Sequence, residues 1–192
     1  MTSRYCALLT AASALVACNP TATTVPAAND VATSNAAAPT DPIESAMRAA
    51  PATLAKDAAG VMANPDGTMK MLREGSNGFT CMPDNPNTPG HDPMCMDANA
   101  MKWAEAWIGK KPPPPNNVGL MYMLSGGSDA SNTDPYGTKP ADGKWVETGP
   151  HVMVVGADSL NKLYPAGDKP DTTKPYVMFG GTPYAHVMMP IQ

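Results

Sequence analysis

Proline and glycine divide this chain into short apolar segments, and this division limits what it can fold into. The 192 residues include 22 prolines and 16 glycines. Proline interrupts helices and cannot donate a hydrogen bond within a sheet, and glycine favours turns. Short strands joined by turn-rich connections are therefore the expected elements over most of the chain.

The apolar runs match this expectation in length and composition. Residues 60–63 and 68–74 flank the turn sequence 64–67, which contains proline and glycine, and together they predict a hairpin. Residues 78–82 are expected to add a third strand. Further strands are expected at 118–124, 145–147, 151–155, 176–179 and 186–189.

One segment has the periodicity of a helix. Asp97 can cap it, apolar residues follow at helical spacing, and Gly109 can end it. Trp103 and Trp107 lie four residues apart and are expected to pack against the sheet, with ligand stacking as the alternative. The sequence thus predicts an α+β fold with a mostly antiparallel sheet and one clear amphipathic helix. A sandwich or a barrel remains an alternative form of that sheet.

The amino-terminal segment has the organisation of a secretory signal. Arg4 supplies a positive charge, and residues 5–16 contain no charged side chain. The run is shorter than the roughly 20 apolar residues of a transmembrane helix. We therefore expect residues 1–17 to be a signal peptide that is removed after export.

The end of this segment carries a motif. Leu15, Val16, Ala17 and Cys18 resemble the lipobox of bacterial lipoproteins. The resemblance implies a lipid on Cys18 and the lipid bilayer as a partner. Asn19 follows the cysteine, which in Gram-negative lipoproteins implies the periplasmic face of the outer membrane. The chain is therefore expected to be a lipid-anchored envelope protein.

The predicted mature chain begins with a tether. Residues 19–39 are mostly Ala, Thr, Pro, Asn and Val with one charge, which is too little apolar surface to order a segment. We expect residues 18–50 to form the lipidated amino terminus and flexible tether, and 51–192 to form a single folded domain. A capping pattern at Asp41, Pro42 and Glu44 predicts a short helix over 42–50, which belongs either to the tether or to the fold.

The cysteines agree with an oxidising compartment. Cys6 leaves with the signal and Cys18 carries the lipid, so Cys81 and Cys95 remain and are predicted to form a disulfide. An alternative is a soft-metal cluster around these cysteines. It needs reduced thiolates, which the compartment disfavours.

Charge limits the classes of partner. The formal net charge is -4, and removing Arg4 with the signal makes it -5. Lys110 and Lys111 are the only adjacent basic pair. This distribution argues against nucleic-acid binding, which needs clustered cations. It identifies no protein partner.

Methionine is unusually frequent, with 15 residues. The triplets that begin at His151 and His186 share the pattern His-x-Met, and alternate residues of a strand lie on one face. If the two strands pair in register, His151, Met153, His186 and Met188 could bind Cu(I). These pairs resemble those of periplasmic copper chaperones, although the spacing between them differs. The alternative is packing alone, because methionine fills irregular cores.

Catalytic motifs are not found in the sequence. It contains no Gly-x-Ser-x-Gly elbow, zincin motif or phosphate-binding loop. A hydrolase using His151 or His186 with Glu147 as general base remains an alternative. Residues 126–128 and the polar cluster at Asp129, Asn132 and Asp134 are expected to form tight turns.

The segments 78–84, 129–136 and 149–153 are similar to those of a group of proteobacterial envelope proteins with no assigned activity. The resemblance implies one compact domain. The leading hypothesis is therefore an anchored binding or structural module without catalysis and with no predicted cofactor. Its rivals are a periplasmic copper(I)-binding protein and a small envelope hydrolase.

Overall fold

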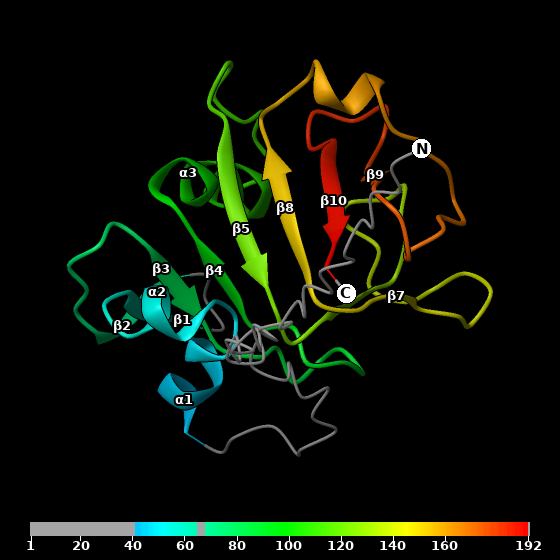
Figure 1. The fold of residues 1–192 in the computed structure, drawn as a ribbon. Helices are drawn as coiled ribbons and strands as arrows, with labels where there is room; N and C mark the ends of the chain where they lie inside the picture. The colour runs from blue at the N-terminus through cyan, green and yellow to red at the C-terminus, as the bar shows by residue number, and fades with distance from the viewer. Residues whose placement is uncertain (1–40, 65–67, 192) are drawn as a thin grey trace, which may run out of the picture. The chain divides into compact units, whose positions relative to one another are not determined.

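The computed structural model describes residues 41–64 and 68–191. Among them, eight strands form one sheet in the order β2-β1-β3-β4-β5-β8-β10-β9 (Figure 1). Strands β6 and β7 form a second, two-stranded sheet. In chain order the elements are α1 (Pro42–Met47), α2 (Ala52–Ala55), β1 (Ala59–Ala63), β2 (Met69–Arg73), β3 (Thr80–Met82), β4 (Met94–Met96), α3 (Ala98–Ile108), β5 (Gly119–Met123), β6 (Gly127–Asp129), β7 (Val146–Thr148), β8 (His151–Val155), the 3-10 helix η1 (Leu160–Lys162), β9 (Tyr176–Met178) and β10 (His186–Pro190).

The large sheet is mostly antiparallel and open. Within the described residues, β1 and β3 are its only parallel neighbours, and every other neighbouring pair is antiparallel. Strands β2 and β9 lie at its two edges. The predicted α+β class is therefore confirmed, and the sheet does not close into a barrel.

Helix α1 belongs to the folded domain. Its cap is the Asp41 carboxylate, which accepts hydrogen bonds from the backbone N–H groups of Ile43 (2.7 Å) and Glu44 (3.2 Å). Ser45 and Ala46 are buried, and the Ser45 hydroxyl accepts a hydrogen bond from Asp84 N. The sequence left this helix open between tether and fold, and in the described residues it packs into the fold through a face of small side chains.

Helix α3 forms as the sequence predicted. The Asp97 carboxylate caps it by accepting from Asn99 N (3.0 Å) and Ala100 N (2.7 Å), and Gly109 ends it. The helix packs very closely on β5. A Cβ added to Gly119 would lie 2.3 Å from Ala100 N, so only glycine permits this approach.

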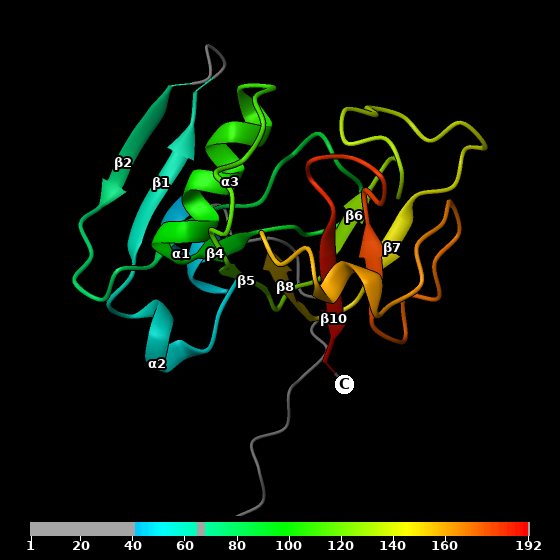
Figure 2. The same ribbon diagram turned by 90° about the horizontal axis from the view of Figure 1, so that it is seen from above.

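The two faces of the sheet bury different side chains. One face carries most of the buried methionines and is covered by α3, which lies on the same side as β6 and β7 (Figure 2). The opposite face carries Cys81 and Cys95 under α1 and α2, and Val154, Val177 and Val187 near η1. A cavity forms on the methionine-rich face.

Candidate functional site

A cavity of about 310 Å³ lies on the methionine-rich face. Its lining comes from α3, from strands β5, β8, β9 and β10, from β6 with the segment after it, and from the loop before β4. The Ser128 hydroxyl accepts a hydrogen bond from Gly90 N (3.0 Å), which connects that loop to β6. Elements that are distant in sequence therefore meet around one cavity that is partly open to solvent.

Thioethers form the sheet wall of the cavity. Because alternate residues of a strand point to the same face, methionines at every second position of neighbouring strands gather on this wall. Thioether side chains are flexible and polarizable, so the wall can adapt to the shape of an apolar ligand. The methionines in the lining are Met94, Met121, Met123, Met153, Met178 and Met188.

Aromatic rings form the helix side of the cavity. Trp103 and Trp107, one helical turn apart on α3, stack with ring centroids 6.0 Å apart. Phe179 lies 6.3 Å from Trp107, and Trp145 adds a further ring to the lining. The expected packing of Trp103 against the sheet is confirmed, since it is 4% exposed in the core cluster. The same two tryptophans also line the cavity, the role that the sequence offered as the alternative.

His186 lines the cavity with an unpartnered nitrogen. Its Nδ1 donates to the carbonyl oxygen of Tyr184 (2.9 Å), so the proton is on Nδ1 and Nε2 keeps its lone pair. Nε2 is buried and has no hydrogen-bond partner among the described residues. The ring lies edge-on to Trp103 at 5.1 Å and to Phe179 at 5.5 Å. Burial lowers the pKa of His186 to about 4, so the imidazole is neutral at pH 7.

His151, the first residue of β8, has the same hydrogen-bond arrangement as His186. Its Nδ1 donates to the carbonyl oxygen of Gly149 (2.7 Å), and its Nε2 is buried without a partner in the described part of the chain. Burial lowers the pKa of His151. Atoms of His151 and Met123 both lie within 4 Å of a Cβ built on Gly127, so the imidazole and that thioether are neighbours.

The four residues predicted to bind Cu(I) share one face but do not converge. Met153 lies directly opposite Met188, whereas His151 is opposite Pro190. Because β8 and β10 are antiparallel, the two His-x-Met triplets run in opposite directions from that methionine pair. The position of β8 that lies beside His186 is four residues from His151. At about 3.4 Å per residue, the two histidines are therefore about 14 Å apart along β8. The structure therefore places the imidazoles on opposite sides of the paired methionines.

Asp129 is a residue of the site that the sequence analysis missed. Gly127 to Asp129, where tight turns were expected, instead form strand β6 and pair with β7, whereas Asn132 and Asp134 lie outside the strands. The Asp129 carboxyl group lines the cavity and accepts no hydrogen bond from any described residue. Burial, together with the charge of Asp92, raises its pKa to about 7. A turn-like composition gave no signal for this burial.

Two further aspartates line the cavity, and both have partners. Asp92 accepts hydrogen bonds from Thr88 Oγ1 (2.5 Å) and Asn85 N (2.9 Å), and burial raises its pKa against the lowering effect of these bonds. Asp134 accepts from Tyr136 N (2.9 Å). The lining formed by described residues contains these acids together with Asp129 and contains no lysine or arginine.

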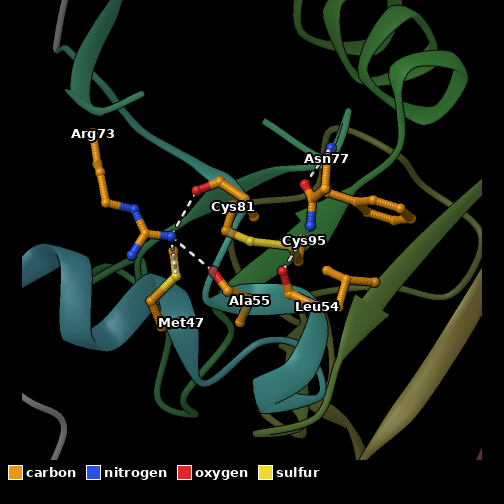
Figure 3. The surroundings of a disulfide bond; sticks show 9 residues. Met47, Leu54, Ala55, Arg73, Asn77, Cys81 and Cys95 are labelled. Atoms are coloured by element: carbon orange, nitrogen blue, oxygen red, sulfur yellow. Dashed lines mark hydrogen bonds between the residues drawn. A yellow bond between two sulfur atoms is a disulfide. The ribbon is translucent and has the colours of Figure 1, made fainter. Parts of the chain in front are cut away.

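The predicted disulfide is present on the opposite face. Cys81 and Cys95 are bonded, with sulfur atoms 2.06 Å apart, and lie directly opposite each other on β3 and β4 (Figure 3). Both are fully buried. Beside them, the Arg73 guanidinium donates to the carbonyl oxygens of Ala55 (2.7 Å) and Ala58 (2.6 Å). Because their sulfur atoms are bonded to each other, these cysteines are not available as ligands for the alternative soft-metal cluster.

The remaining site predictions concern lipid attachment, metal binding and the membrane. Cys18, the predicted lipid attachment, lies outside the described residues. No group of three or more His, Cys, Asp or Glu side chains within 41–64 and 68–191 is arranged to hold a metal ion. In the same ranges, no helix has the length and apolar character needed to cross a membrane.

The site and fold together define an α+β domain with an open, mostly antiparallel sheet and a cavity lined by thioethers and aromatic rings. Comparisons with protein families, with curated proteins and with solved structures found no match.

Proposed function

We propose that this protein is a membrane-anchored binding module of the bacterial envelope, without catalysis, whose cavity holds a small, mostly apolar ligand. The lipobox-like residues Leu15 to Cys18 support the anchor, with Cys18 carrying the lipid at the periplasmic face of the outer membrane. The uncharged composition of most of residues 19–39 supports a tether. The cavity supports the binding role.

One observation carries the binding role: two acceptors that line one cavity, His186 Nε2 and the Asp129 carboxyl group, have no hydrogen-bond partner among the described residues. His186 Nε2 is buried and the Asp129 carboxyl group is partly buried, and neither receives a hydrogen bond from a described residue. Leaving a buried polar group unsatisfied costs about 1–3 kcal/mol. Leaving two acceptors without partners would only lower the stability of a domain that had no ligand to bind. A ligand that presents donors to them would offset both.

The size and lining of the cavity agree with this role. Small-molecule sites have volumes of roughly 300–1,000 Å³, mostly apolar walls and a few placed polar groups. This cavity, at about 310 Å³, is at the lower end of that range. It therefore suits a compact ligand with one or two ring systems rather than a long chain.

Binding of a neutral apolar fluorophore tests the proposal. N-phenyl-1-naphthylamine emits more strongly in apolar surroundings, and we expect saturable binding with one site per chain. Ala104→Leu adds bulk to a buried cavity position on α3 and should weaken binding at least fivefold. Ala98→Leu, at an exposed position of the same helix, should not change it.

Two results would overturn the binding role. The first is the absence of saturable fluorescence enhancement with the folded wild-type protein. The second is equal binding by the wild type and by Ala104→Leu, with both folded by circular dichroism, because the probe would then lie elsewhere.

The histidine geometry favours copper(I) binding as a second candidate function. Imidazoles that bind metals commonly donate their other N–H to a backbone carbonyl, as His151 and His186 do. Their free Nε2 atoms lie on either side of the paired Met153 and Met188, on the same face of the sheet. Thioether sulfur and neutral imidazole are suitable Cu(I) ligands. Each imidazole could act with neighbouring thioethers rather than in the four-residue set predicted from the sequence.

Competition with the Cu(I) chelator bicinchoninate tests this candidate, with ascorbate as reductant. We expect the wild type to remove Cu(I) from the chelator, and Met153→Leu combined with Met188→Leu to reduce that affinity at least tenfold. Met71→Leu, at an exposed position of β2, is the matched control. Failure of the wild type to retain Cu(I) would end the candidate without affecting the binding of apolar probes.

The hydrolase alternative receives no support from these contacts. His151 and His186 donate through Nδ1 to backbone carbonyls rather than to a carboxylate. Glu147, the predicted general base, is exposed on β7. A hydrolase would need one of these imidazoles to meet a carboxylate within hydrogen-bond reach.

A further inference from the structure

The Asp129 carboxyl group gives the cavity a chemical preference. It lies at the end of β6, opposite Val146 of β7, and lines the cavity together with methionines and aromatic rings. It has neither an ion-pair partner nor a hydrogen-bond donor among the described residues. A carboxylate enclosed in this way is stabilised by a positive charge brought close to it.

The described residues that line the cavity do not supply this positive charge. Asp92 and Asp134 add two more acids to the wall, and no lysine or arginine lines it. Asp92 lies near enough to disfavour ionisation of Asp129. The wall is therefore complementary to a cation and unfavourable to an anion.

The aromatic wall agrees with the same preference. Rings attract an organic cation through their negative faces, and tryptophan does so most strongly. Trp103, Trp107, Trp145 and Phe179 all line the cavity. Thioethers complete an apolar surface for the uncharged part of a ligand. The carboxyl group and the rings thus suit the cationic part of a ligand, and the thioethers suit its uncharged part.

We propose that the ligand of this cavity is an organic ammonium ion, with an aromatic or compact apolar body against the thioethers and rings and an N–H donor directed to Asp129. The second unpartnered acceptor, His186 Nε2, can receive a further donor from the same ligand. This inference rests on the proposed binding function and names the chemical class of its ligand.

The titration of Asp129 makes the preference dependent on pH. The titratable groups around it are Asp92, Asp134 and His186 in the cavity lining, and Tyr176, which its charge influences. Of these groups, His186 is neutral above its lowered pKa and supplies no counter-charge near pH 7. Because the pKa of Asp129 is raised to about 7, an ammonium ligand that binds below that pH must displace a proton.

Displacement of bound N-phenyl-1-naphthylamine by two matched competitors tests the inference. The competitors are 1-naphthylmethylamine and 1-naphthalenemethanol, which differ in carrying an ammonium group or a hydroxyl group. At pH 8 we expect the amine to displace the probe from the wild type at a concentration at least tenfold lower than the alcohol. Asp129→Asn should abolish that difference. Asp158→Asn makes the same change in net charge at an exposed position and should keep it.

The pH profile of the wild type is an independent readout that needs no variant. Between pH 8 and pH 6 the affinity for the amine should fall by about tenfold, and the affinity for the alcohol should stay constant. Equal displacement by the two competitors, or an amine preference that persists in Asp129→Asn, would overturn the ligand class. Failure of the probe itself to bind would instead refute the proposed function.

Discussion

A buried carboxyl group without a hydrogen-bond partner, such as that of Asp129, destabilises the folded state when it ionises. In the unfolded chain the group has its ordinary pKa of 3.8, whereas burial raises that pKa to about 7 in the folded protein. The stability associated with Asp129 is therefore fully present below the unfolded value and is lost as the pH rises through the folded one. Between these two values the unfolded state is the one that ionises first.

Replacing this carboxyl group should change how stability depends on pH. We expect Asp129→Asn to match the wild type near pH 4 and to exceed its free energy of unfolding at pH 8 by up to about 4 kcal/mol. Urea unfolding followed by tryptophan fluorescence at the two pH values measures this difference. Asp158→Asn should follow the wild type at both. A constant difference between Asp129→Asn and the wild type would mean that the group does not titrate in this range.

Among the elements, β3 and β4 depend most on a covalent connection. Each is only three residues long, and they are joined by the disulfide between directly opposite cysteines. Cross-linking residues that are 14 apart restricts the unfolded chain and stabilises the fold by about 3 kcal/mol. The bond also fixes one face of the sheet beneath α1 and α2.

Removal of this bond should lower stability without changing the fold. The double variant Cys81→Ala with Cys95→Ala is expected to lose about 3 kcal/mol of unfolding free energy in urea. Reduction of the wild type with dithiothreitol should give a comparable loss, and the same treatment should leave the double variant unchanged. A reductant effect on the double variant would assign the loss to something other than the disulfide.

Most elements were predictable because each has a local signal. The hairpin of β1 and β2, helix α3 and strands β5, β8, β9 and β10 follow from apolar runs, caps and turns. Strand β4 was missed because its three residues lie within a turn-rich loop, and β6 because Gly127, Ser128 and Asp129 have turn composition. The local pattern cannot reveal what partner strands a short segment will find.

The candidate site was predictable only in part, for the same physical reason. The sequence indicated a shared face for His151, Met153, His186 and Met188, since alternation within a strand is local. It could not indicate that β8 and β10 run antiparallel with Met153 opposite Met188, which separates the imidazoles. The burial of Asp129 depends on contacts with distant segments and has no local signal.

The molecule as a whole combines a proposed anchor with a weakly acidic domain. The formal charge is -4 for the full sequence, and charged residues are only 16% of it. Electrostatic attraction to an acidic membrane surface is therefore not expected to hold the protein in place. The lipid on Cys18 is the proposed attachment, with a second acyl chain needed for stable anchoring.

Substitution of the predicted lipidated residue tests the attachment. In cells supplied with labelled palmitate, we expect the wild type to incorporate label and to fractionate with membranes. Cys18→Ser should lose the label and leave the membrane fraction. Cys6→Ser changes a cysteine within the predicted signal and should keep both properties. Labelled Cys18→Ser would show that the lipid is elsewhere.

The position of α1 has a mechanical consequence. The described chain enters the fold at Asp41, and α1 follows at once, held by Ser45 and Ala46 against the disulfide-bearing side of the sheet. A pulling force transmitted from a membrane attachment would load these contacts first. The cavity lies on the other face, next to α3. Tension on the proposed tether would thus act on the disulfide-bearing side of the sheet rather than on the face with the cavity.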